Sequence, residues 1–88
     1  MKTESQKFTD AVKHVKDYFE DTLNKGKCAI NYWYAPHGRA LKHLIKREVV
    51  KEIFIGECFI GYEYKEHLIL RERGTGDCEE YYILKGKV

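Results

Sequence analysis

Two seven-residue segments share one alternating pattern, and this pattern constrains the fold more than any other feature of the chain. Residues 28–34 read CAINYWY and residues 58–64 read CFIGYEY, so both follow Cys-x-Ile-x-Tyr-x-Tyr, thirty residues apart. Alternation with period two is typical of a β-strand, because successive side chains of a strand point to opposite faces. The pattern therefore predicts two strands, each with Cys, Ile and Tyr on one face.

An amphipathic helix is predicted before the first of these strands. Its apolar residues recur at spacings of three and four, which places them on one stripe. These residues are Phe8, Ala11, Val12, Val15, Phe19 and Leu23. Thr3 and Gln6 fit a capping box, and Gly26 fits the C-terminal end, where φ is often positive. We expect a helix from about residue 4 to about residue 24.

The similarity between the two segments extends to the residues before them. A shift of thirty residues aligns the stripe Ala11, Val15, Phe19 and Leu23 with Leu41, Ile45, Val49 and Ile53. Residues 39–53 fit either a strand or a helix, and the aligned stripe favours a helix. We therefore hypothesise an internal duplication of a thirty-residue helix–strand unit, with repeat-like units at about 5–34 and 35–64. Chance similarity after choice of the best offset is the alternative.

The C-terminal part predicts a hairpin over residues 65–86. A tight turn at Lys65-Glu66 would lead into a strand at 67–73, and the turn GTGD would precede a last strand at 79–85. Strand–helix–strand units usually form right-handed crossovers, so we expect the two repeated strands to be parallel. The predicted fold is α/β (α+β), a single-domain two-layer sandwich of residues 1–88. Its order is α-β-α-β-β-β, with a mixed four-stranded sheet and two helices on one face.

The residue types that could carry chemistry do not occur at the spacings that such sites use. Cys28, Cys58, His37 and His67 are of zinc-ligand type, yet each Cys lies nine residues from its His. Structural zinc sites favour pairs two to four residues apart. Cys78, beside the GTGD turn, is the most exposed candidate nucleophile, but the sequence indicates no His partner for it. We expect no catalytic residue, no metal and no cofactor.

Two short segments resemble motifs of known families. Glu63-Tyr64-Lys65 resembles the E-x-K step of the PD-(D/E)xK nucleases, but the acidic partner in a Pro-Asp context is absent, since the only proline, Pro36, precedes His37. Residues 30–40 and 57–73 resemble strands of the WYL-type small β-barrel regulators, a likeness that requires residues 39–53 to form a strand. Neither resemblance matches enough of its family's motif to carry that family's residues over.

Charge and aromatic content bear on the class of partner. The 88 residues include 16 basic and 14 acidic ones, for a net charge of +2, and 14% are aromatic. A general DNA-binding domain normally has a strong basic excess, which this chain lacks. Two helices can cover only one face of a sheet, so the other face would remain as an aromatic patch, and such patches mark interaction sites. A sheet that curls and buries both faces is the alternative.

These observations predict a small non-enzymatic binding protein, a homo-oligomeric regulator or inhibitor that contacts another protein through an aromatic sheet face. The alternative is a protein that binds or sequesters a nucleotide or single-stranded nucleic acid such as RNA, by stacking on Tyr or Trp and by Arg or His contacts to phosphate. The candidate binding residues are Tyr32, Trp33, Tyr34, Tyr62, Tyr64, Arg39, His67, Arg71 and Arg73. No membrane span or signal peptide is visible, which predicts a cytoplasmic location and no membrane partner. Chains of this size are common in phages and mobile elements.

Overall fold

The computed structural model describes residues 1–30, 35–73 and 80–88 of the chain, and these residues form two helices and five strands. In chain order the elements are α1 (Glu4–Lys25), β1 (Lys27–Ile30), α2 (Ala35–Lys46), β2 (Lys51–Ile55), β3 (Phe59–Tyr64), β4 (His67–Glu72) and β5 (Glu80–Lys87). The strands form one sheet in the order β1-β5-β4-β3-β2. Each strand is antiparallel to its neighbours.

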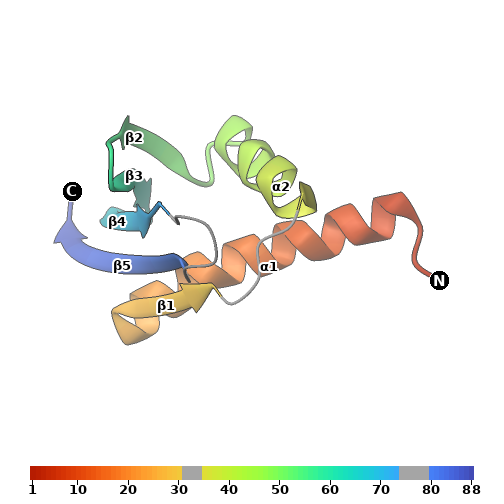
Figure 1. The fold of residues 1–88 in the computed structure, drawn as a ribbon, viewed down its shortest axis with the longest axis horizontal. Helices are drawn as coiled ribbons and strands as arrows, with labels where there is room; N and C mark the ends of the chain where they lie inside the picture. The colour runs from red at the N-terminus through yellow and green to blue at the C-terminus, as the bar shows by residue number, and fades with distance from the viewer. Residues whose placement is uncertain (31–34, 74–79) are drawn as a thin grey trace.

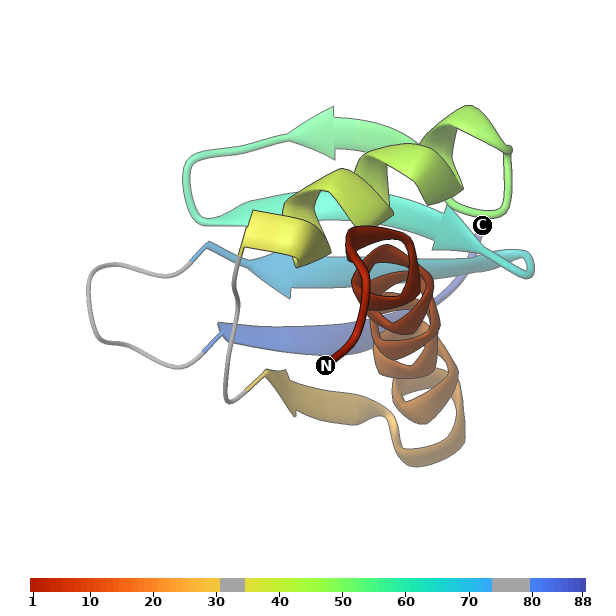
Figure 2. The ribbon, with the colours of Figure 1, turned by 90° about the vertical axis from the view of Figure 1, so that its right-hand side faces the viewer.

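Both helices lie on the same side of the sheet, so the molecule has two layers (Figure 1). Figure 2 shows α1 and α2 in front of the sheet, with β1 and β2 at its two edges. The helix α1 packs against α2 and against β1, β4 and β5. The predicted two-layer arrangement with two helices on one face is therefore confirmed. The core lies between the layers.

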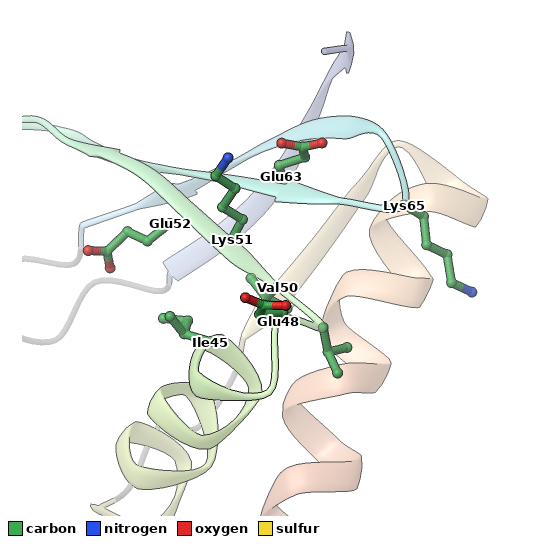
Figure 3. Close-up of a pocket in the computed structure, with 8 residues that line it drawn as sticks. Ile45, Glu48, Val50, Lys51, Glu52, Glu63 and Lys65 are labelled. Atoms are coloured by element: carbon green, nitrogen blue, oxygen red, sulfur yellow. The ribbon is translucent and has the colours of Figure 1, made fainter.

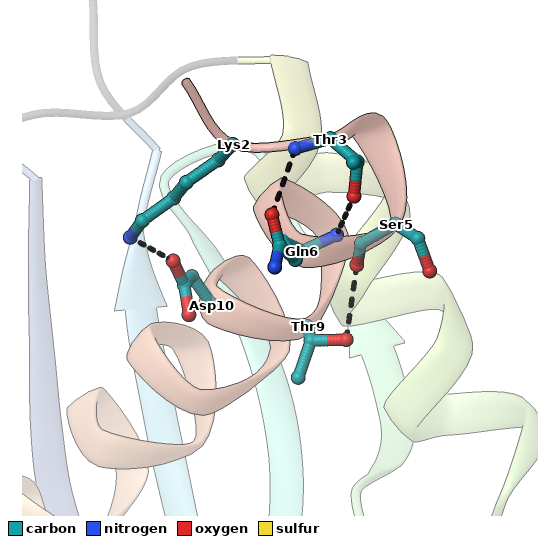
Figure 4. Close-up of polar contacts among 6 residues, drawn as sticks. All are labelled: Lys2, Thr3, Ser5, Gln6, Thr9 and Asp10. Carbon is teal, nitrogen blue, oxygen red and sulfur yellow. Dashed lines mark hydrogen bonds and ion pairs between the residues drawn. The ribbon is translucent and has the colours of Figure 1, made fainter.

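The first helix forms where its capping residues and apolar stripe predict it. The side chain of Thr3 accepts a hydrogen bond from the Gln6 N–H at 3.1 Å, and the Gln6 side chain accepts one from the Thr3 N–H at 2.9 Å (Figure 4). At the other end Gly26 has φ 79°, a conformation that costs little only for glycine. The helix predicted at about 4–24 is confirmed.

The second helix is shorter than predicted, because it ends at Lys46 rather than near residue 53. The N–H of Glu48 donates to the Ile45 carbonyl and the N–H of Val49 donates to the Leu44 carbonyl, which is the hydrogen-bond pattern of a Schellman cap. Glu48 occupies the left-handed position of this cap with φ 63°. The β-branched and aromatic residues that follow then form strand β2.

The predicted four-stranded mixed sheet is wrong in strand number and direction. The strand β2 adds a fifth strand, and the sheet is entirely antiparallel. The strands β1 and β3, predicted to be parallel, are separated by β5 and β4 and do not pair. The expected crossover fails because the chain between them contains a helix and also a strand. The proposed duplication is not confirmed, since residues 46–53 form a helix end, a turn and a strand where residues 16–23 are helical.

The turn between β3 and β4 falls at Lys65-Glu66, as predicted. Both residues have positive φ, 48° and 67°, as the two central positions of a type I′ hairpin turn require. The strands β4 and β5 pair antiparallel, as predicted for the last two strands. The GTGD turn between them and Cys78 lie outside the described residues.

Candidate interaction surface

The sheet face under the helices carries Tyr62 and Tyr64, the tyrosines of the second repeated segment. Tyr62 and Tyr64 of β3 are each 1% exposed, and Tyr82 of β5 is fully buried. All three rings surround Phe19 of α1, with ring centroids 5.5, 5.4 and 4.8 Å from it. The face of β3 with Ile60, Tyr62 and Tyr64 is therefore the core face, as is the face of β1 with Cys28 and Ile30. Its tyrosines pack against α1 rather than against solvent.

Two polar links tie this buried cluster to charged residues at its margin. The Tyr64 hydroxyl donates to a carboxylate oxygen of Glu20 at 2.6 Å, and the Lys65 ammonium binds the same oxygen. These two hydrogen bonds, from Lys65 first and then from Tyr64, lower the pKa of Glu20. Burial, with the Glu20 hydrogen bond, raises the pKa of Tyr64. The link joins α1 to the β3–β4 turn.

The second link lies on the same face, nearer the other end of the strands. Arg71 of β4 binds Glu80 of β5 at 3.2 Å and reaches the Tyr62 hydroxyl at 3.4 Å. Both charged side chains are mostly buried, at 14% and 20% exposure. Burial is also the main cause that raises the pKa of the Tyr62 hydroxyl. Arg71 therefore acts in the structure as a cross-strand partner within the protein.

The predicted binding residues that the structure describes do not lie together on one exposed surface. Tyr62, Tyr64 and Arg71 lie on the core face, as described above. Arg39 is exposed on α2, in the helix layer. His67 is partly buried, and its Nδ1 lies 2.9 Å from the Lys65 carbonyl oxygen. Arg73 donates to the Gly56 carbonyl at 2.9 Å. The remaining candidates, Tyr32, Trp33 and Tyr34, lie outside the described residues.

The opposite face of the sheet is covered by no helix or strand of residues 1–30, 35–73 and 80–88, and we call it the open face. One row of the strand register crosses it from edge to edge: Lys27, Ile83, Leu70, Gly61 and Phe54. Phe59, Leu68 and Tyr81 belong to the same face, because side chains alternate along each strand. The apolar members of this set are partly buried or exposed, and the Lys27 ammonium lies 4.7 Å from the Tyr81 ring centroid. The open face is thus largely apolar.

Phe54 links the open face to the edge strand β2. Its ring occupies the place above Gly61 where a side chain would be, since a Cβ added at Gly61 would lie 2.2 Å from the ring. A β-bulge lies between Glu52 and Phe54, so Ile53 and Phe54 together oppose Gly61. Phe54 is nevertheless 44% exposed, with Ile53 at 43% and Ile55 at 64%. Sequence reasoning missed this surface because it placed residues 47–53 in a helix.

A groove of about 710 Å³ lies at the junction of α2, β2 and β3 (Figure 3). It is lined by Ile45, Glu48, Val49, Val50, Lys51, Glu52, Glu63 and Lys65. The charged lining residues are three glutamates and two lysines, and Lys65 extends toward α1, in agreement with its bond to Glu20. Among the described residues that line it, none is a His, Cys or Ser.

The cysteines occupy two different environments. Cys28 is partly buried on β1, and burial raises the pKa of its thiol, whereas Cys58 is exposed in the β2–β3 turn. A raised pKa disfavours the reactive thiolate. Among the described residues, His, Cys, Asp and Glu side chains form no group of three that could hold a metal ion.

Comparisons with protein-family models, with curated proteins and with solved structures return no match for this chain. No helix in the described part of the chain is long and apolar enough to span a membrane. The geometry of the sheet is therefore the basis for a functional assignment. It defines the class as a small two-layer α+β domain, in which no helix or strand of the described residues covers one face of the sheet.

Proposed function

We propose that the chain is a small, non-enzymatic binding protein, a homo-oligomeric regulator or inhibitor that acts through protein–protein contacts of its open face. One observation carries this proposal: a row of the open face runs across all five strands and ends at the exposed Phe54 of β2. Apolar surface that solvent reaches marks interaction sites; here Leu70 and Ile83 are partly exposed and Phe54 is 44% exposed. Aromatic residues such as Phe54, Phe59 and Tyr81 are typical of the centres of protein interfaces.

The charges of the open face favour a protein partner over a nucleic acid. Lys27 and Lys51 share this face with Glu63 and Glu72, so the opposite charges balance. Nucleic-acid binding depends on a positive surface that neutralises phosphates. The predicted phosphate contacts also lie elsewhere, since Arg71 binds Glu80 on the core face and Arg39 lies on α2.

Self-association through the open face can be tested by NMR of labelled methyl groups in a dilution series from millimolar to micromolar protein. The methyl signals of Leu68, Leu70 and Ile83 should shift with concentration, while those of the core residues Ile30 and Leu44 should stay constant. Leu70→Glu should abolish these concentration-dependent shifts. Val88→Glu changes an exposed apolar residue outside the open face and should preserve them. A protein that remains monomeric at high micromolar concentration in light scattering would contradict self-association.

A nucleotide or single-stranded nucleic acid is the second candidate ligand, favoured by one observation. The open face carries aromatic rings on which bases could stack, and Lys27 lies beside one of them, Tyr81. A thermal-shift screen against nucleotides and short RNA separates the two proposals. A ligand at 100 times its dissociation constant should stabilise the fold by about 2.7 kcal/mol, and the absence of any shift would remove this candidate.

A further inference from the structure

The edge strand β2 concentrates the exposed apolar residues of the chain. Within the described residues, the large apolar side chains that are exposed are those of Val49, Ile53, Phe54 and Ile55, besides the terminal Met1 and Val88. All five residues of β2 are exposed, and its outer edge pairs with no other strand of the described ranges. Such an edge presents unpaired backbone N–H and C=O groups as a template for another strand. Soluble proteins normally protect such an edge with charges, prolines or a covering segment.

The sequence around β2 is self-complementary about Phe54. Reading outward from Phe54, Ile53 matches Ile55, and Lys51 matches Glu57. A two-fold axis through an antiparallel pair of strands brings each residue opposite its counterpart in the other copy. An axis at Phe54 would therefore place Ile53 opposite Ile55 of the second copy. It would also bring Lys51 near the β2–β3 turn of the second copy, which carries Glu57 just beyond the end of the strand.

From this arrangement we infer that a second copy of the chain pairs antiparallel with β2 about a two-fold axis at Phe54, joining two five-stranded sheets into one. The inference rests on the proposed self-association and assigns it to a particular edge and register. The symmetry buries the three exposed apolar residues of β2 against each other and extends the open face of one copy into that of the other. Backbone pairing supplies affinity, and the matched side chains supply the register.

The charges at the ends of the segment support a second copy as the occupant. Lys51 and Glu57 are both exposed, and neither forms an ion pair with any residue that the structure describes. Two-fold pairing would bring Lys51 of each copy close to Glu57 in the β2–β3 turn of the other, so that two equivalent ion pairs could form. Like charges would not meet, since Glu52 would lie opposite the uncharged Gly56 of the second copy.

The bulge in β2 is compatible with this pairing. Bulges often bend an edge strand and so protect it from pairing. Here the bulge lies opposite Gly61, and the Phe54 ring fills the space above that glycine. Ile53 and Ile55 remain 43% and 64% exposed beside the ring. The bulge therefore fixes Phe54 on the sheet without covering the edge.

Charge reversal at the two ends tests the register directly. Lys51→Glu and Glu57→Lys each replace two attractive pairs per dimer with two repulsive ones, which should raise the dimer dissociation constant roughly tenfold in sedimentation equilibrium. The double variant restores opposite charges and should recover the original constant. The two single variants mixed together should form a heterodimer of similar affinity, because position 51 of each copy would then face an opposite charge at position 57 of the other. Circular dichroism checks that each variant is folded.

An apolar edge variant with a matched control completes the test. Ile55→Lys should weaken the dimer, whereas Val88→Lys, which adds the same charge at an exposed apolar residue outside β2 and the open face, should leave the constant unchanged. If the mixture of Lys51→Glu and Glu57→Lys dimerises no more tightly than either variant alone, the β2 register is refuted. If Leu70→Glu then still disrupts association, the proposed open-face function stands without the edge. A monomeric wild-type protein would refute both.

Discussion

Two buried tyrosines differ in the partners of their hydroxyl groups, and removal of each hydroxyl should have opposite effects on stability. Tyr64 is 1% exposed and donates a hydrogen bond to Glu20 at 2.6 Å. Tyr82 is fully buried, and its hydroxyl has no hydrogen-bond partner within the described part of the chain. Tyr64→Phe should therefore destabilise the fold, and Tyr82→Phe should stabilise it, although the chemical change is identical.

The magnitudes follow from the hydrogen bonds. A hydrogen bond to a charged group contributes about 1.5–3 kcal/mol, and Glu20 at 32% side-chain exposure can recover some hydration once the hydroxyl is gone. We expect Tyr64→Phe to cost about 1.5 kcal/mol of unfolding free energy. A buried hydroxyl without a partner carries a desolvation penalty of about 1–3 kcal/mol, so Tyr82→Phe should gain about 1 kcal/mol.

The effect at Tyr64 should also depend on pH. The pKa of Glu20 is lowered from its ordinary value of 4.5 in the folded protein, so its stabilising contribution is present above that pH and decreases as the pH falls through the folded value. The difference between wild type and Tyr64→Phe should therefore shrink in acid, whereas the difference for Tyr82→Phe should not change. Neither tyrosine ionises in this range, since burial raises the pKa of both hydroxyls.

Urea denaturation followed by tyrosine and tryptophan fluorescence at about pH 7 and about pH 3.5 measures all of these differences. Glu20→Gln provides a double-mutant cycle with Tyr64→Phe, and their coupling energy isolates the hydrogen bond. Equal effects of Tyr64→Phe and Tyr82→Phe at neutral pH would refute the assignment of hydrogen bonds in the core. A cycle with no coupling between residues 20 and 64 would refute the link between α1 and β3.

Four further substitutions test local parts of the fold, each by urea denaturation. Glu66→Gly should stabilise the protein by about 1 kcal/mol, because Glu66 has φ 67° in the hairpin turn and glycine avoids the steric cost of a side chain at positive φ. A loss of stability would contradict the turn type. Glu48→Gly should give a similar gain at the cap of α2, where φ is 63°, and an unchanged unfolding free energy would argue against that cap. Thr3→Ala should cost about 1 kcal/mol through loss of the capping box, with Ser at this position as a conservative control. Arg71→Met should cost about 3 kcal/mol, since it removes the mostly buried ion pair with Glu80; a cost near zero would mean that the ion pair contributes nothing.

The first helix and three of the strands could be predicted because each has one strong local signal. The stripe from Phe8 to Leu23 has period 3.6 and its capping residues mark both ends, so α1 lies where expected. The alternation in residues 58–64 likewise predicts β3, and β4 and β5 follow at their expected places. These signals depend only on the local chain, and tertiary packing agrees with them.

The region after residue 46 could not be predicted, because two periods fit it equally well. Leu41, Ile45, Val49 and Ile53 continue a helical stripe, yet Val49 and Ile53 are exposed in the structure. The chain leaves the helix at Glu48, a residue with no intrinsic preference for positive φ, so no glycine marked the end. The apparent repeat strengthened the wrong choice. The candidate surface was misplaced for the same reason, because an edge strand at 51–55 determines which apolar residues reach solvent.

The glycine at residue 61 connects the core, the open face and the edge. Its neighbours Tyr62 and Ile60 face the helices, so the alternation of β3 directs position 61 to the open face, where it supplies no side chain. Phe54 fills that space from the adjacent strand, and cross-strand aromatic cover of a glycine fixes the ring at little entropic cost. A ring that is held in place yet 44% exposed is already ordered before a partner arrives. Preorganisation of this kind reduces the cost of association, which makes Phe54 the residue about which an interface of this protein would be built.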